Sequence, residues 1–119
     1  MNHKNLIAYK KAFNNAMKCR AIAKGFPKDE LFMLTSQITR SSRSVVSNLT
    51  EGYRKRAYPK HFKSKLTDAD SENSETDLWL DFAVASGYVT EFSINELRNE
   101  ISEVGKLLNY MINNPDKFQ

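Results

Sequence analysis

Residues 59–87 read PKHFKSKLTDADSENSETDLWLDFAVASG, and this stretch decides the fold. Its apolar and small residues alternate steps of four and three: Phe62, Leu66, Ala69, Asn73, Thr76, Leu80, Ala83 and Gly87. Such spacing keeps one face of a helix turned toward its neighbours and predicts a bundle seam with a small, polar middle. Pro59 suits the first turn of this helix.

The segment that follows is predicted to form a second seam. Thr90 or Ser93 can cap its start, and Ser93 with Glu96 has the spacing of a capping box. Its apolar positions keep the heptad spacing: Ile94, Leu97, Ile101, Val104, Leu108 and Met111. We expect this helix to end at Asn113-Asn114-Pro115.

Two earlier segments complete the set. The segment of about residues 31–51 carries Leu31, Leu34, Ile38, Val45 and Leu49 at three–four spacing, and Gly52 is expected to end it. The segment of about residues 4–24 is expected to bury a stripe formed by Leu6, Tyr9, Phe13, Ala16 and Ala23. Gly25 and Pro27 follow it as a helix-ending glycine and a block to continuation.

Four such helices with short connections predict one all-α domain over residues 1–119, an antiparallel up-down-up-down four-helix bundle. No segment alternates long enough to compete as a strand. With 119 residues and 40% apolar residues, the chain can bury a core without a disulfide or a metal.

Cys19 is the only cysteine, which excludes an intrachain disulfide and favours a reducing, cytoplasmic setting. We interpret it as an inert, packed thiol. The N-terminal residues lack the apolar core of a signal peptide, and no stretch approaches the ~20 apolar residues of a membrane span.

Charge is distributed unevenly along the chain. Residues 1–65 hold 15 Lys/Arg against 3 Asp/Glu, whereas residues 66–119 hold 3 against 11. This division fits an anionic partner for the first half, an attraction between the two halves, or both.

A cluster of cations marks the candidate site. Between residues 40 and 65 lie eight basic residues: Arg40, Arg43, Arg54, Lys55, Arg56, Lys60, Lys63 and Lys65. Tyr53, Tyr58, His61 and Phe62 are interleaved with them. Lys60, Lys63 and Lys65 fall at a predicted helix start, where positive charge opposes the helix dipole and suits an incoming anion. The alternative is solvated charge, or charge that pairs with the acidic half or with another subunit.

Two further groups have structural and functional interpretations. Gln37, Ser44, Asn48 and Glu51 form a polar stripe, which we interpret as groups hydrogen-bonded across helices or to backbone rather than as a ligand-binding row. Trp79, Phe82 and Tyr88 fit a subunit interface and plain core packing equally well.

Helical bundles often hold di-iron sites, which use Glu-x-x-His motifs. Neither His3 nor His61 follows a glutamate by three positions, and no Gly-x-Ser-x-Gly, P-loop or dinucleotide motif occurs. We therefore expect no catalytic residues, no metal and no cofactor, and rank a metal-dependent enzyme last.

Several stretches resemble one known family. The second predicted helix contains LTSQI at residues 34–38 and SVVSNLTEGY at residues 44–53. Further matches are Phe26-Pro27, SET at residues 74–76, WLDFA at residues 79–83, GYV at residues 87–89, EVGKLL at residues 103–108 and MINNP at residues 111–115. They resemble the four-helix-bundle proteins encoded in intervening sequences of bacterial 23S rRNA genes, also described as small ribosomal proteins. Val46 and Ser41-Ser42 depart from the family pattern, and the second departure places Arg40 and Arg43 differently here.

The resemblance implies a four-helix bundle that assembles into a ring-like homopentamer. The chain is also similar to the accessory variability determinant of diversity-generating retroelements, a basic pentamer that binds nucleic acid and a reverse transcriptase. Together these observations predict a non-enzymatic, homo-oligomeric accessory protein whose basic surface binds RNA or DNA phosphates. The alternative is a protein-interaction scaffold whose basic half docks an acidic partner or a neighbouring subunit.

Overall fold

The computed structural model describes residues 2–119. Four long helices make up most of the chain: α1 (Ile7–Ala23), α2 (Leu34–Arg54), α3 (Pro59–Ala85) and α4 (Glu91–Asn113). Three short 3-10 helices accompany them: η1 (His3–Asn5), η2 (Lys28–Glu30) and η3 (Pro115–Phe118). No strand occurs among the described residues, which confirms the all-α prediction.

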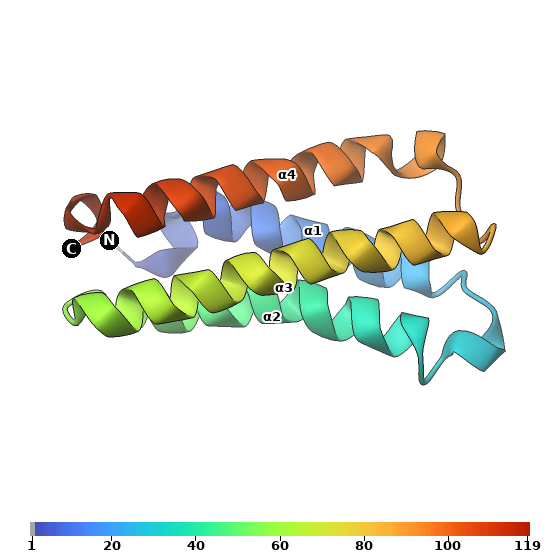
Figure 1. Cartoon of the computed structure of the whole chain (residues 1–119), viewed down its shortest axis with the longest axis horizontal. Coiled ribbons are helices and arrows are strands. Elements are labelled where there is room, and N and C mark those ends of the chain that lie inside the picture. The colour runs from blue at the N-terminus through green and yellow to red at the C-terminus, as the bar shows by residue number, and fades with distance from the viewer. Residues whose placement is uncertain (1) are drawn as a thin grey trace.

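The helices form an antiparallel bundle measuring 44 × 26 × 20 Å (Figure 1). Each helix packs on the helices before and after it in the chain, and α4 closes the bundle by packing on α1. The helices α1 and α3 are therefore diagonal to each other. Figure 1 shows both chain termini at the end of the bundle that also holds the α2–α3 turn. No described helix is both long and apolar enough to cross a membrane.

The seams of α3 and α4 were predicted correctly except at Gly87, which is exposed. All seven α3 seam positions from Phe62 to Ala83, and all six α4 positions from Ile94 to Met111, are buried. Gly87 follows α3 with a φ of 77°, the left-handed conformation that favours glycine after a helix. The capping box of α4 joins Thr90 to Ser93, and the predicted pairing of Ser93 with Glu96 was therefore wrong.

Three expectations about the first half need correction. In α1 the buried face consists mainly of small residues (Ala8, Ala12, Asn15, Ala16, Cys19 and Ala23), while Phe13 points into solvent. Leu31 lies before α2 and is exposed. Gly52 does not end α2, which continues to Arg54. This glycine is buried against α3, and a Cβ built on it would lie 3.1 Å from the Lys65 Cβ. The close approach of two helices, not a helix end, explains this glycine.

The core has two apolar clusters, one toward each end of the bundle. One surrounds Leu49, Phe62 and Leu108, and the other surrounds Ile38, Leu80 and Ile101. Buried polar side chains lie near the middle of the helices: Asn15, Ser41, Ser42, Asn73 and Thr76. The α3 seam predicts small and polar residues in the middle of the core, and α1 and α2 contribute such residues there as well.

Candidate nucleic-acid interface

The α2–α3 turn brings most of the predicted basic residues to one end of the bundle. The backbone N–H of Lys55 donates to the carbonyls of Glu51 and Gly52, at 3.2 and 3.0 Å, and ends α2. The N–H of Tyr58 then donates to the Lys55 carbonyl at 2.8 Å, and Pro59 opens α3. This tight reversal places the cations that end α2 beside those that begin α3.

Four of these cations are exposed and form no ion pair with any carboxylate of residues 2–119: Arg54, Lys55, Lys60 and Lys63. The first turn of α3 contains no acidic residue, although acidic side chains are favoured there. The positive end of the helix dipole therefore adds to the lysine charges. This end of the molecule suits an anion.

Arg56 has a more constrained position than its neighbours. Its Nη1 donates to the Tyr53 carbonyl at 2.9 Å, and its guanidinium lies 4.3 Å from the centre of the Tyr53 ring. Because Tyr53 is buried, Arg56 is held at the turn and keeps other donors for a ligand. Tyr58 and His61 form an exposed edge-to-face aromatic pair, with ring centres 6.2 Å apart, beside these cations.

Three predicted residues do not join this group. Arg40 bonds Glu72 at 2.9 Å and Glu75 at 2.6 Å, so it links α2 to α3. Lys65 bonds Glu51 at 2.8 Å, a hydrogen bond that raises the pKa of Lys65 and lowers the pKa of Glu51. Arg43 is exposed but lies eleven residues before Arg54, about 16 Å along the helix axis.

Two other lysines lie at the same end of the molecule. Lys4 belongs to η1 and Lys117 to η3, and the termini that carry them flank the α2–α3 turn in Figure 1. The Lys117 Nζ donates to the Tyr110 hydroxyl at 3.0 Å, which raises the pKa of Lys117. A shallow hollow of about 460 Å³, lined by Arg54, Arg56, Ala57 and Gln119, opens between the turn and the C-terminus. The up-down-up-down topology itself could have pointed to these lysines, because it brings both termini to the α2–α3 end.

The polar stripe of α2 bonds mostly within its own helix. The Asn48 amide donates to the Ser44 carbonyl at 2.9 Å, and the Gln37 amide oxygen accepts from Arg40 Nε at 3.5 Å. Glu51 alone reaches a neighbouring helix, through Lys65. These contacts fit the structural interpretation of the stripe. Inside the bundle, a bond between α2 and α3 instead links Ser41 to Thr76, which the stripe did not include.

The three aromatic residues near the end of α3 differ in their surroundings, although Trp79 and Phe82 lie close together, with ring centres 5.8 Å apart. Tyr88 donates its hydroxyl to Glu30 at 2.8 Å and packs on Phe26, with ring centres 5.6 Å apart. Trp79 is half-buried against the core, and Phe82 is exposed. Core packing thus accounts for Tyr88 but not for Phe82.

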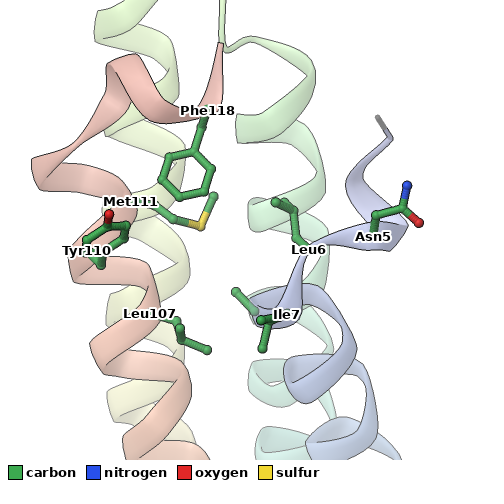
Figure 2. Close-up of a pocket in the computed structure, with 8 residues that line it drawn as sticks. Asn5, Leu6, Ile7, Leu107, Tyr110, Met111 and Phe118 are labelled. Atoms are coloured by element: carbon green, nitrogen blue, oxygen red, sulfur yellow. The ribbon is translucent and has the colours of Figure 1, made fainter.

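Figure 2 shows an apolar groove of about 320 Å³ between the start of α1 and the end of α4. Leu6 and Ile7 face Leu107 and Met111 across it, and Phe118 lies above Met111 in this view. Its only titratable side chain is that of Tyr110, whose hydroxyl accepts from Lys117. The groove offers shape and apolar surface without an acid–base pair.

Reactive groups elsewhere are few. Burial raises the pKa of the Cys19 thiol to about 12, with the Ser42 hydroxyl acting in the opposite direction, so the thiol is protonated at neutral pH. Within residues 2–119 no three His, Cys, Asp or Glu side chains are grouped as metal ligands would be.

Comparison with known proteins identifies a family and a solved structure of the same fold. The 23S rRNA-intervening sequence protein family matches residues 4–110. A crystal structure of a protein of unknown function from the S23 ribosomal protein family of Bacteroides thetaiotaomicron has the same fold, with a TM-score of 0.81 and 26% sequence identity. The match covers 90% of this chain and 96% of that one. No curated protein matches the sequence.

Proposed function

The chain belongs to the 23S rRNA-intervening sequence protein family, and we propose that it is a homo-oligomeric, non-enzymatic accessory protein that binds RNA or DNA phosphates through the basic end of its bundle. The residues assigned to this contact are Arg54, Lys55, Arg56, Lys60 and Lys63, with Lys4 and Lys117 at its margin.

The observation that carries the proposal is the group of four unpaired cations around one helix reversal. By contrast, Arg40 and Arg98 bond carboxylates of α3. Near the α2–α3 turn, the Glu51 carboxylate is bonded to Lys65 and to none of these four cations. Cations that the fold leaves without partners can release condensed counterions when they neutralise phosphates.

The surface favours backbone contacts over base readout. Lysine and arginine at a convex turn can reach successive phosphates, and the Arg56 guanidinium is partly fixed by Tyr53. Tyr58 is 65% exposed and offers a ring on which an unpaired base can stack. The expected ligand is therefore a structured RNA or a DNA recognised through shape and charge.

A binding titration across a salt series tests the proposal, with a structured RNA and a duplex DNA as probes. The variant Arg54→Gln/Lys55→Gln/Lys63→Gln should bind about tenfold or more weakly at low salt. Its log–log salt slope should be shallower by about 2–3, because each lost phosphate contact removes about 0.9 from the slope for duplex DNA.

The control variant Lys18→Gln/Lys24→Gln/Lys28→Gln removes the same charge away from the basic end of the bundle. Its oligomeric mass is checked in parallel. Equal losses in both variants would mean that net charge, not the basic end, drives binding. Failure of the wild-type protein to bind either probe at low salt would overturn the proposal.

A second candidate function is a protein-interaction scaffold. It is favoured by large apolar side chains that the single chain leaves exposed, among them Phe32 at 88% and Phe92 at 94%. The two candidates differ in their dependence on nucleic acid. A protein complex that persists after nuclease treatment, together with absent binding in the titration, would favour the scaffold.

A further inference from the structure

Two helices present a pair of large apolar side chains to solvent, one helical turn apart. On α1 these are Phe13, 49% exposed, and Met17, 59% exposed. On α3 they are Leu78, 46% exposed, and Phe82, 52% exposed. Residues four apart lie on the same side of a helix, so each pair forms a compact apolar surface. We name them the α1 face and the α3 face.

The two faces lie in opposite electrostatic surroundings. Helix α1 contains four Lys or Arg residues and no acidic residue. Residues 66–85, which carry the α3 face, contain six acidic residues and no Lys or Arg. Two arginines from neighbouring helices, Arg40 and Arg98, bond four of those carboxylates, so the α3 side keeps a negative balance.

The bundle prevents the faces from meeting within one molecule. Because α1 and α3 are diagonal, their outer surfaces point to opposite sides, with α3 at the front and α1 at the back of Figure 1. Pairing of like faces in a two-fold dimer would set cations against cations, or carboxylates against carboxylates. Pairing of unlike faces instead matches both the apolar pairs and the charges.

The α3 face also offers a recess. Phe82 and Trp79 line a hollow of about 430 Å³ together with Phe32 and Met33 from the segment before α2. A side chain of the size of phenylalanine or methionine fits such a recess.

We propose that the α1 face of one copy packs on the α3 face of the next copy, in a head-to-tail contact. This inference specifies the surfaces of the oligomer in the proposed function and rests on that part of it. Contacts between unlike faces repeat from copy to copy, and they close into a ring when the rotation between copies permits.

Complementation between two single-face variants tests the contact. Met17→Glu disables the α1 face, and Phe82→Glu disables the α3 face; both introduce the same charge, so the new side chains cannot pair. Each variant alone should sediment as a 13.7 kDa monomer. An equimolar mixture should form a heterodimer of twice that mass, because each variant retains the face that the other lacks.

Circular dichroism confirms the fold of each variant, and Leu78→Glu replaces Phe82→Glu if the latter unfolds. Phe92→Glu is the matched control, since Phe92 is an exposed aromatic residue of α4 outside both faces. It should keep the wild-type mass.

An oligomeric wild type whose variants fail to complement would overturn the assigned faces and leave the proposed function intact. A monomeric wild type would overturn both the contact and the oligomeric part of the function, while the nucleic-acid titration stands separately.

Discussion

The side-chain oxygens of Ser41 on α2 and Thr76 on α3 lie 2.8 Å apart inside the bundle, both shielded from solvent. The Thr76 hydroxyl donates to the Glu72 carbonyl at 2.9 Å, so its own proton is already used. The Ser41 hydroxyl also lies 3.4 Å from the Ile38 carbonyl of its own helix, and the shorter contact favours Ser41 as donor to Thr76. A buried donor whose better acceptor lies on the neighbouring helix favours a single axial register, because sliding either helix would leave it only the longer contact.

This bond should be measurable as a coupling between the two residues. We expect Thr76→Val to lower the free energy of unfolding by about 1–2 kcal/mol, because it leaves the buried Ser41 hydroxyl only the longer contact with the Ile38 carbonyl. Ser41→Ala should cost less, since Thr76 keeps its bond to Glu72. Urea unfolding of the single and double variants should give a coupling energy of about 1 kcal/mol. Additive effects would show that the two hydroxyls do not interact.

Two helical glycines should respond to alanine with opposite signs. At Gly52 a new Cβ would lie 3.1 Å from the Lys65 Cβ, next to the α3 backbone, and 3.4 Å from Leu66 Cδ2. At Gly105 in α4 it would meet the Asn73 Nδ2 at an ordinary 3.4 Å. Alanine is favoured over glycine inside a helix by about 1 kcal/mol. We expect Gly105→Ala to realise most of this gain and Gly52→Ala to lose about 1 kcal/mol, since α2 and α3 must separate.

Thermal or urea unfolding of both variants checks the difference in sign. A stabilised Gly52→Ala would mean that the helices can move apart at little cost, and that the glycine is not needed for their close approach. A destabilised Gly105→Ala would place α4 nearer to Asn73 than the structure has it.

Sequence reasoning succeeded where a local pattern carries the information. The seams of α3 and α4 could be predicted because apolar and small residues recur at steps of three and four. The basic turn could be predicted because Arg54, Lys55 and Lys60 are close in sequence. In α1 the buried face is mostly alanine. The larger exposed side chains of Phe13 and Met17 dominate the hydrophobic pattern, so the pattern predicts the wrong buried face. Burial there depends on how closely neighbouring helices approach.

The candidate site shows the same division. Whether a cation is available to a ligand depends on carboxylates that folding brings near it. Arg40 meets Glu72 and Glu75 from more than thirty positions away, and no local pattern marks it as paired. Lys4 and Lys117 reach the basic end only because the topology brings both termini there.

The buried thiol of Cys19 predicts a loss of stability at alkaline pH. Its folded pKa of about 12 lies above the value of about 8.5 for an exposed thiol. The contribution to stability is therefore complete below pH ~8.5 and declines as the pH rises toward 12, because the unfolded chain then binds fewer protons. Between pH 8 and pH 10.5 the wild type should lose about 2 kcal/mol more than Cys19→Ala.

Urea unfolding of both chains at the two pH values gives this difference directly. The other groups that titrate in the range, lysines and tyrosines, are common to both chains and cancel. Equal losses would place the folded pKa of Cys19 near its ordinary value, and the thiol would then be accessible as a thiolate.

Two buried asparagines provide the last prediction, because they differ in whether the amide is satisfied. Asn73 on α3 donates to the Ile101 carbonyl at 2.8 Å, whereas both amide atoms of Asn15 on α1 are buried without a partner among residues 2–119. An unsatisfied buried amide costs about 1–3 kcal/mol, so removing it should be favourable. Alanine replaces both residues here, so the gain in helix propensity is the same and cancels between the variants.

We expect Asn15→Ala to raise the free energy of unfolding by about 1–2 kcal/mol and Asn73→Ala to lower it by a similar amount. The midpoints of urea unfolding at a common slope measure both changes. A destabilised Asn15→Ala would mean that the packing lost with this side chain, or a hydrogen bond that it forms in solution, outweighs the cost of the unsatisfied amide.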